Sequence, residues 1–371
     1  GLARHGGGRA VERSDVEGVV SRDATPADVL AGAARWCVVE GDALALLASL
    51  PDASVNLAWI DPPYYRVVAE AWDRAWPSET EYLRWLRGIV AELARVLAPN
   101  GSLYLFASPE MAARVEVATA ECLRVLNAVT WAKPETPNAG KYGPENFRRW
   151  VQMSERVVFA ERRGRFGGGV LGDEIRGARE SAGLTRDQLD VAIGRTLRRD
   201  PSKGSGLIRL QELGERTPSA EDFAAALRAC GDDRAASELQ TEYLRLLRPF
   251  AAPASFTDVW TYASAPAVPG RHPCEKPAAM LRDVVLASSR EGDVVLDLFG
   301  GSHRMGEVAL SEGRRYLAAD SDPHWAAVGT ERCRAVVNGT APVVPARAAA
   351  PAPAADPRQR SLFDLLAEGA R

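Results

Sequence analysis

The sequence predicts an α/β fold built on a doubly wound, mostly parallel sheet. Short apolar segments of strand length alternate with segments of helical periodicity, and this alternation is typical of parallel sheets covered by helices. Two of the apolar segments, residues 57–60 and 293–297, lead directly into polar turns. Because open α/β sheets bind ligands at the carboxyl ends of their strands, these segments are expected to mark the functional edge of the sheet.

The composition excludes several classes of protein. With 371 residues, 46% of them hydrophobic, the chain can form one large catalytic domain with an insert and tails. It has no apolar run of membrane-spanning length and no apolar signal segment at its start, so we expect a cytoplasmic protein without a membrane partner. The five cysteines and four histidines are dispersed, which indicates neither a disulfide framework nor a metal site. At a net charge of −3, any DNA-binding surface must be local.

The first half of the predicted domain comprises residues 34–165, after a flexible N-terminus of residues 1–33. Strands are expected at 36–40, 57–60, 102–106, 128–132 and 156–160, and helices at 26–35, 43–50, 79–97 and 110–125. Pro99-Asn100-Gly101 predicts a turn into the third strand. Residues 133–147 form a long irregular loop, which in a compact domain is commonly functional; a plain surface crossover is the alternative.

Residues 166–250 have a different, helical character. Helices are expected at 175–182, 186–193, 206–213 and 220–229. The first three resemble the helix-turn-helix of phage repressors, with Gly183-Leu184-Thr185 as the first link and an extended turn at 195–205 where that family is shorter. The resemblance implies that this insert recognises the DNA target. Positive charge for phosphate contacts is concentrated in Arg195, Arg198, Arg199, Lys203 and Arg209. A helical insert with a solvated charged face is the alternative.

The second half of the domain, residues 251–337, contains a nucleotide-binding arrangement. After a helix at 278–288, strand 293–297 runs into a turn of small residues, a helix follows at 305–312, and strand 316–319 ends at Asp320. Gly300 and Gly301 let the backbone approach a ligand, and Asp320 can accept hydrogen bonds from ribose hydroxyls. The turn has no lysine for a triphosphate and departs from Gly-x-Gly-x-x-Gly, which argues against ATP and NAD.

The strand at 57–60 is stopped by Asp61-Pro62-Pro63-Tyr64. Two prolines prevent further ladder hydrogen bonds and stiffen the backbone. An acid, a carbonyl oxygen and an aromatic ring are therefore held in one place at the end of a strand. An ordinary strand-ending turn is the alternative interpretation.

Together, the Asp61-Pro62-Pro63-Tyr64 motif and the nucleotide-binding arrangement resemble those of the amino-methyltransferases of DNA, which methylate an exocyclic nitrogen with S-adenosylmethionine. The resemblance covers residues 36–160 and 271–336 and matches the permuted β class, in which the catalytic motif precedes the cofactor loop. It implies a Rossmann-like methyltransferase sheet with Asp61, Pro62, Pro63 and Tyr64 as the catalytic motif. The implied cofactor residues are Asp42, His272, Lys276, Asp297, Phe299, Gly300, Gly301, Ser302 and Asp320.

One departure from that family lies in the cofactor loop. The family usually has Gly-Ser-Gly-Thr where this chain has Gly301-Ser302-His303-Arg304. The side chain of His303 is therefore expected to point away from the cofactor, since otherwise it would weaken or prevent binding.

The resemblance implies a mechanism that needs no metal. If the Asp61 carboxylate and the Pro62 carbonyl accept the two N–H bonds of an amino group, its lone pair points at the sulfonium methyl. Tyr64 would stack on a base flipped out of double-stranded DNA. The cytosine enzymes commonly have Ser in place of Asp61, so N6 of adenine is the expected target. Lys133, at the start of the long loop, is included among the DNA-binding residues.

Other activities remain as alternatives. They are methylation of cytosine N4, methylation of RNA or protein, and a DNA-binding regulator on an inactive methyltransferase fold, for which His303-Arg304 is the only support. Whether the enzyme has a restriction partner or acts alone is open.

The C-terminal region is expected to be an Ala/Pro linker, residues 338–358, and a terminal peptide, residues 359–371. Gln359-Arg360-Ser361-Leu362-Phe363 resembles the short peptide with which bacterial proteins bind the replication sliding clamp, which would bring the protein to the nucleoid. An amphipathic helix that docks on the protein itself or forms a homodimer is the alternative.

Overall fold

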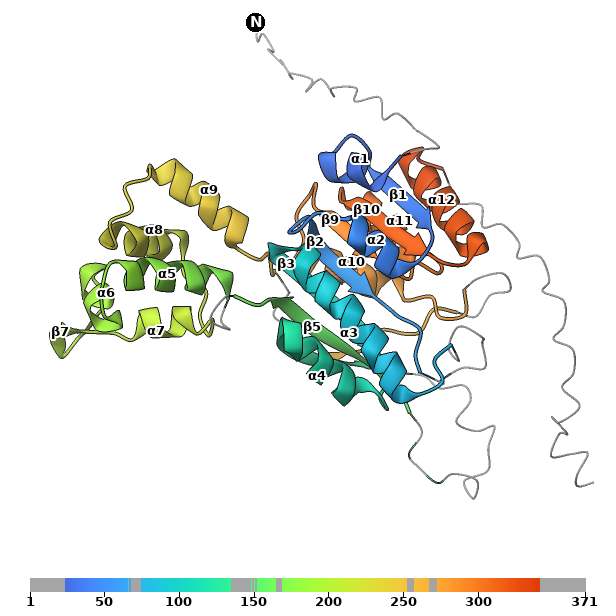
Figure 1. The fold of residues 1–371 in the computed structure, drawn as a ribbon, viewed down its shortest axis with the longest axis horizontal. Helices are drawn as coiled ribbons and strands as arrows, with labels where there is room; N and C mark the ends of the chain where they lie inside the picture. Colours follow the sequence, from blue (N-terminus) through green and yellow to red (C-terminus); the bar gives the residue numbers. More distant parts are fainter. Residues whose placement is uncertain are drawn as a thin grey trace, which may run out of the picture.

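The computed structural model describes residues 24–65, 67, 75–134, 148, 150, 152–164, 169–251, 257–266 and 272–340. In this part of the chain a large α/β domain carries a helical lobe (Figure 1). The predicted clamp peptide and most of the long loop at 133–147, of the linker and of the N-terminus lie outside the described residues.

The α/β domain is built on an eight-stranded sheet, which confirms the predicted fold class. In spatial order its strands are β1 (Trp36–Glu40), β10 (Arg315–Asp320), β9 (Val294–Asp297), β2 (Val55–Ile60), β3 (Leu97–Ala107), β5 (Ser154–Arg162), β4 (Leu123–Ala132) and β8 (Val259–Trp260). The first five strands are parallel, and β5 is antiparallel to both of its neighbours. From β9 the chain continues to β10 on one side, and from β2 it continues to β3 on the other side, so the pair of β9 and β2 is the switch point of the sheet.

Two layers of helices cover the sheet. One face carries α1 (Pro26–Ala31), α2 (Ala43–Ser49), α3 (Glu79–Val96) and α4 (Ala112–Cys122), and the other carries α10 (Ala278–Ser288), α11 (Arg304–Ser311) and α12 (Pro323–Val337). Strand β2 shows why both layers form. Ala58 and Ile60 belong to the first apolar core, whereas Leu57 and Trp59 belong to the second. This side-chain alternation, with apolar residues on both faces, is typical of a central strand.

Several elements of the domain differ from the sequence prediction. The predicted turn at 99–101 lies inside β3, where the register with β2 shifts. The sequence analysis does not predict β8 or α12, although Asp322 and Pro323 give α12 a recognisable start: the Asp322 side chain accepts the His324 N–H, and Pro323 stands in the first turn. None of the described helices has the length and apolarity needed to span a membrane.

The helical lobe has its own apolar core. It consists of α5 (Val170–Ser181), α6 (Arg186–Ala192), α7 (Leu207–Glu212), α8 (Ala220–Ala229) and α9 (Ala236–Leu246), which pack around Ile175, Leu189, Ile208, Phe223 and Leu239. The structure of this region differs from the sequence prediction in two respects. The extended turn at 195–205 is a two-stranded hairpin of β6 (Thr196–Leu197) and β7 (Asp200–Gly204), and α9 was not predicted.

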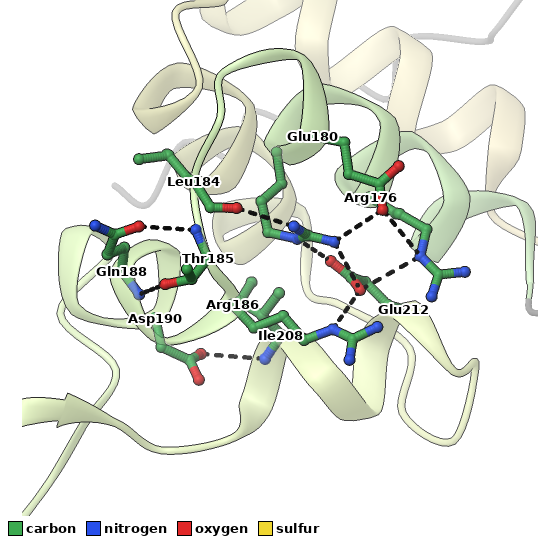
Figure 2. A network of polar contacts seen from close by, with 10 residues as sticks. Arg176, Glu180, Leu184, Thr185, Arg186, Gln188, Asp190, Ile208 and Glu212 are labelled. Atoms are coloured by element: carbon green, nitrogen blue, oxygen red, sulfur yellow. Dashed lines mark hydrogen bonds and ion pairs between the residues drawn. The ribbon is translucent and has the colours of Figure 1, made fainter.

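A buried ionic cluster joins the first three helices of the lobe (Figure 2). The fully buried side chain of Glu212 lies 3.6 Å from Arg176, 2.5 Å from Arg179 and 2.6 Å from Arg186. Nearby, the buried Asp190 accepts the N–H groups of Gly206 at 2.8 Å and Ile208 at 3.1 Å. Asp190 therefore caps α7 from α6, so the hairpin leaves and re-enters the lobe at fixed points.

Candidate active site

The carboxyl ends of four adjacent strands bring the predicted cofactor and catalytic residues to one edge of the sheet. Strand β1 is followed by Asp42, β10 ends at Asp320, β9 ends at Asp297, and β2 is followed by Asp61. The register places Glu40 beside Asp320, and Trp59 beside Asp297. Asp42 begins α2, and its side chain accepts the Ala45 N–H at 3.0 Å.

The glycine turn after β9 is held against Asp320. Gly301 has a φ of +48°, and its N–H donates to Asp320 Oδ2 at 2.7 Å, while Asp320 Oδ1 accepts the Asp322 N–H at 2.9 Å. A carboxylate oxygen has two lone pairs, so each oxygen of Asp320 retains acceptor capacity for a ribose hydroxyl. A Cβ on Gly301 would come within 3.1 Å of the His272 ring, so this turn accepts only glycine without adjustment. The turn therefore fits the nucleoside part of S-adenosylmethionine.

His303 points into the protein interior, as the sequence analysis expected. It is fully buried with a φ of +51°, and its ring fills the space left by two glycines, Gly300 and Gly329. His303 Nδ1 lies 3.0 Å from the Tyr316 hydroxyl, which donates to Asp297 Oδ2 at 3.1 Å. Burial lowers the pKa of His303 to about 3 and raises the pKa of Asp297 to about 7. The hydrogen bonds from His303 through Tyr316 to Asp297 support the turn from the interior of the protein.

The remaining predicted cofactor residues lie around this turn. Phe299 packs with its ring centroid 5.8 Å from that of Trp85 on α3, and Ser302 is buried. The ring of His272 lies 4.7 Å from that of Trp325 on α12. Lys276, another of the implied cofactor residues, forms an ion pair with Asp61.

Asp61 lies in a cluster of two carboxylates, two lysines and a tyrosine. The Tyr64 hydroxyl is 3.0 Å from Asp61 Oδ1 and 3.0 Å from Glu155 Oε2. Lys276 Nζ contacts Asp61 Oδ2 and lies 3.5 Å from Glu155 Oε2, and Lys133 Nζ lies 2.5 Å from Glu155 Oε1. Lys133 is also 4.8 Å from the centre of the Trp131 ring. The structure thus gives Lys133, predicted as a DNA contact, a partner inside the active-site cluster.

Burial and charge act in opposite directions on these groups. Burial raises the pKa of Asp61, Lys276 opposes this shift, and the negative charge of Glu155 adds to it. Burial also acts to raise the pKa of Glu155, but Lys276 and Lys133 outweigh it, so the pKa of Glu155 is lowered. The pKa of Tyr64 is raised well above its usual value, first by burial and then by the two carboxylates. Perturbed ionisable groups that converge at the end of a strand are typical of catalytic sites.

Glu155 is a site residue that the sequence analysis missed. It lies near the start of β5, which runs antiparallel to β3 and therefore begins at the edge where β2 and β3 end. The sequence contains one signal, an acidic residue just before the apolar residues of this strand. Without the order of the strands in the sheet, nothing relates that acid to Asp61.

The other predicted DNA-binding residues lie on the lobe. Arg198, Arg199 and Lys203 are exposed on the hairpin, and Arg209 is exposed on α7. Arg195 instead pairs with Asp222 of α8 at 2.7 Å.

Comparison with known proteins gives a consistent family match. The DNA methylase family of N6 and N4 methyltransferases matches residues 55–331. The DNA adenine methyltransferase YhdJ of Escherichia coli (strain K12) is 24% identical over 300 residues, which is 80% of this chain and 81% of the relative. The type II methyltransferase M2.DpnII of Streptococcus pneumoniae is 38% identical over 81 residues, 21% of this chain and 30% of the relative.

Solved structures give weaker similarities. The cytosine-N4-specific PvuII DNA methyltransferase is 14% identical, covers 82% of this chain and 94% of its own, and has a TM-score of 0.48. The complex of M1.HpyAVI with S-adenosylmethionine is 15% identical, covers 80% and 98% of the two chains, and has a TM-score of 0.45. These scores are below 0.5, so the family assignment rests on the sequence match.

Proposed function

The chain belongs to the N6/N4 DNA methylase family and is an S-adenosylmethionine-dependent DNA methyltransferase, and from this we propose that it methylates N6 of an adenine flipped out of a specific duplex sequence. The observation that carries the proposal is the placement of Asp61 directly after β2, which pairs with β9, the strand that leads into the glycine turn. Pro62 supplies the neighbouring carbonyl. The name of the curated adenine methyltransferase relative supports adenine over cytosine.

The cofactor would be held by the turn at 298–302, by Asp320 through the ribose and by Asp42 near the adenine. When bound, S-adenosylmethionine supplies an electrophilic methyl group on a sulfonium. The residues of the protein have to hold the weakly nucleophilic amino group so that its lone pair faces that methyl. The Asp61 carboxylate and the Pro62 carbonyl would each accept one N–H bond, which positions the nitrogen and stabilises the positive charge that develops on it.

The cluster around Asp61 explains how this acceptor is kept available. Lys276 contacts one oxygen of Asp61, and the Tyr64 hydroxyl covers the other. When an amino group approaches, the hydroxyl can give its hydrogen bond to Glu155 and release Asp61 Oδ1 without losing an acceptor. Glu155 is therefore proposed as a positioning residue for Tyr64 and Lys276.

The regulator alternative has no support from the site. Its only basis was His303-Arg304 in the cofactor loop. The His303 side chain lies behind the loop rather than over it, and Arg304 pairs with Glu307 of α11 at 2.6 Å. We therefore propose a catalytically competent enzyme.

Asp61→Ala tests the proposed active site. The variant should lose methyl transfer while it retains S-adenosylmethionine binding in calorimetry, because Asp61 contacts the amino group and not the proposed ribose site. Analysis of nucleosides from DNA treated with the unmodified protein identifies the product. N6-methyladenine supports the proposal, N4-methylcytosine contradicts the choice of base, and transfer at the normal rate by Asp61→Ala contradicts the choice of site.

A further inference from the structure

The helical lobe is attached to the α/β domain at the amino ends of the parallel strands, whereas the active site lies at their carboxyl ends. Its anchors are hydrogen bonds from Arg124 to the Gly214 carbonyl at 3.1 Å and from Arg290 to the Leu247 carbonyl at 3.0 Å, and an ion pair between Arg248 and Glu161 at 2.7 Å.

All three anchors lie at the amino ends of the parallel strands. Glu161 pairs in register with Arg124, near the amino end of β4. Arg290 precedes β9, and Arg124 is the second residue of β4, which runs in the same direction as β3. Figure 1 shows the lobe on the side where β3 begins, with β7 at its far end.

The length of β5 gives the separation between the active site and the anchors of the lobe. Glu155 at its start belongs to the Asp61 cluster, and Glu161 near its end binds the lobe anchor Arg248. Six residues of an extended strand span about 20 Å. The hairpin lies beyond the anchors, so it is farther still from Asp61. Duplex DNA is stiff over such lengths, with a persistence length of about 50 nm, and would have to turn back around the domain to contact both surfaces.

The hairpin nevertheless has the charge of a phosphate-binding surface. Between residues 195 and 204 it carries four cations, of which only Arg195 is held by a strong ion pair to another element of the lobe. Lys203 lies 3.8 Å from Asp200 within the hairpin, and the Lys203 side chain is largely exposed. Arg198 and Arg199 are exposed between the two strands. The Asp190 cap fixes the base of the hairpin, and the Glu212 cluster holds α5, α6 and α7 together, so these cations are presented by a folded support.

We propose that the lobe binds a second segment of duplex DNA, distinct from the duplex whose base enters the Asp61 site. The inference rests on the proposed function, because it presupposes that a target duplex occupies the carboxyl edge. It assigns the lobe to holding a neighbouring DNA segment rather than to recognition of the target. Two duplex contacts on one protein would keep the enzyme on DNA between methylation events, since the second contact raises its effective concentration near further sites.

The test uses the full-length protein with two duplexes. A short, unlabelled duplex that carries the target sequence, found by sequencing modified bases, is first bound to saturation together with S-adenosylmethionine. A longer fluorescent duplex without that sequence is then titrated, and its anisotropy is followed. We expect the labelled duplex to bind with unchanged affinity and sedimentation to show both duplexes on one protein. Competition between the two duplexes would overturn the inference, because it would mean that one DNA site serves both.

A matched pair of variants locates the second contact. Arg198→Ala with Arg199→Ala should weaken binding of the labelled duplex about tenfold or more and reduce the slope of log K against log salt by up to about two, as expected when two phosphate contacts are lost. The control is Arg234→Ala with Arg245→Ala, which removes two arginines that are ion-paired within the lobe at 2.6 Å each and should change neither quantity. Equal effects of the two pairs of substitutions would contradict the assignment of the second contact to the hairpin.

The proposed function and this inference fail in different ways. Wild-type protein that methylates no DNA would refute the proposed function, whereas normal methylation with a single bound duplex would refute only this inference.

Discussion

The hydroxyl of Tyr64 lies 3.0 Å from Glu155 Oε2, although the two residues are 91 positions apart in the chain. The same hydroxyl lies 3.0 Å from Asp61 Oδ1. A phenol has one hydrogen, so with both carboxylates ionised it donates to only one of them at a time. Glu155 is thus an alternative acceptor for Tyr64 at the moment when Asp61 must bind an amino group.

Glu155→Gln should therefore slow methyl transfer by about tenfold to a hundredfold, the range expected when a hydrogen bond to a charged group is weakened. Because the carboxylate of Glu155 raises the pKa of Asp61, the neutral amide should lower that pKa. Transfer needs ionised Asp61, so the acid limb of kcat/KM should move to lower pH. Lys276, Tyr64, Cys274 and Asp297 also influence this cluster and are retained in the variant.

The control for this prediction is Glu312→Gln, which removes a carboxylate ion-paired with Arg282 at 2.8 Å at the far end of α11. Single-turnover rates across pH should be the same for this variant and the unmodified protein. A double-mutant cycle with Tyr64→Phe completes the test. If Glu155 acts by holding the Tyr64 hydroxyl, the two effects are non-additive, whereas strictly additive effects would refute that role.

The cofactor turn gives a second prediction. Gly301→Ala should weaken S-adenosylmethionine binding in calorimetry, because a Cβ there both strains a φ of +48° and approaches the His272 ring to 3.1 Å. Gly313→Ala is a matched control with a φ of +78° beside the flexible side chain of Glu291. It should destabilise the fold without changing cofactor affinity. Asp320→Ala should weaken binding as well, and equal affinity of all three variants would exclude this turn as the cofactor site.

These two sites differ in how far the sequence predicts them. Asp61, Gly301 and Asp320 each follow an apolar strand, so local pattern alone placed them at one edge. Glu155 joins that edge only because β5 runs antiparallel between β3 and β4. No local feature of the sequence indicates that direction. The sequence predicts only a turn at 195–205 because the strands of the hairpin there are short and polar. The position of the hairpin depends on Asp190, a buried acid 16 residues from Gly206.

A third prediction concerns stability and pH. Between about pH 3 and 6.5 the unfolded chain protonates His303 and the folded protein does not, so this group destabilises the fold as the pH falls. Between about pH 4 and 7 the folded protein retains a proton on Asp297 that the unfolded chain loses, so Asp297 destabilises the fold as the pH rises. The two slopes have opposite sign and should largely cancel in the unmodified protein.

Single variants should expose each slope. In His303→Asn, chosen because Asn tolerates a left-handed φ, the free energy of unfolding should decrease as the pH rises from about 4 to 7, by up to about 1.4 kcal/mol per pH unit. In Asp297→Asn it should instead decrease as the pH falls from about 6.5. Urea unfolding across this range measures both. Parallel pH profiles for the two variants would contradict the assigned protonation states.

The last prediction addresses the support of the hairpin. Glu212 is fully buried and neutralises part of the charge of three arginines, Arg176, Arg179 and Arg186. Glu212→Gln would leave these cations without their shared counterion, and removing one partner of a buried ion pair costs about 3–5 kcal/mol.

The lobe has its own apolar core, so in this variant it should unfold while the α/β domain remains folded. Limited proteolysis should then cut within the lobe, whereas the affinity for S-adenosylmethionine in calorimetry should be unchanged. Glu242→Gln on α9, which breaks an exposed pair with Arg245, is the control and should cost less than about 1 kcal/mol. Loss of cofactor binding together with the lobe would show that the two regions unfold as one unit and that the hairpin has no independent support.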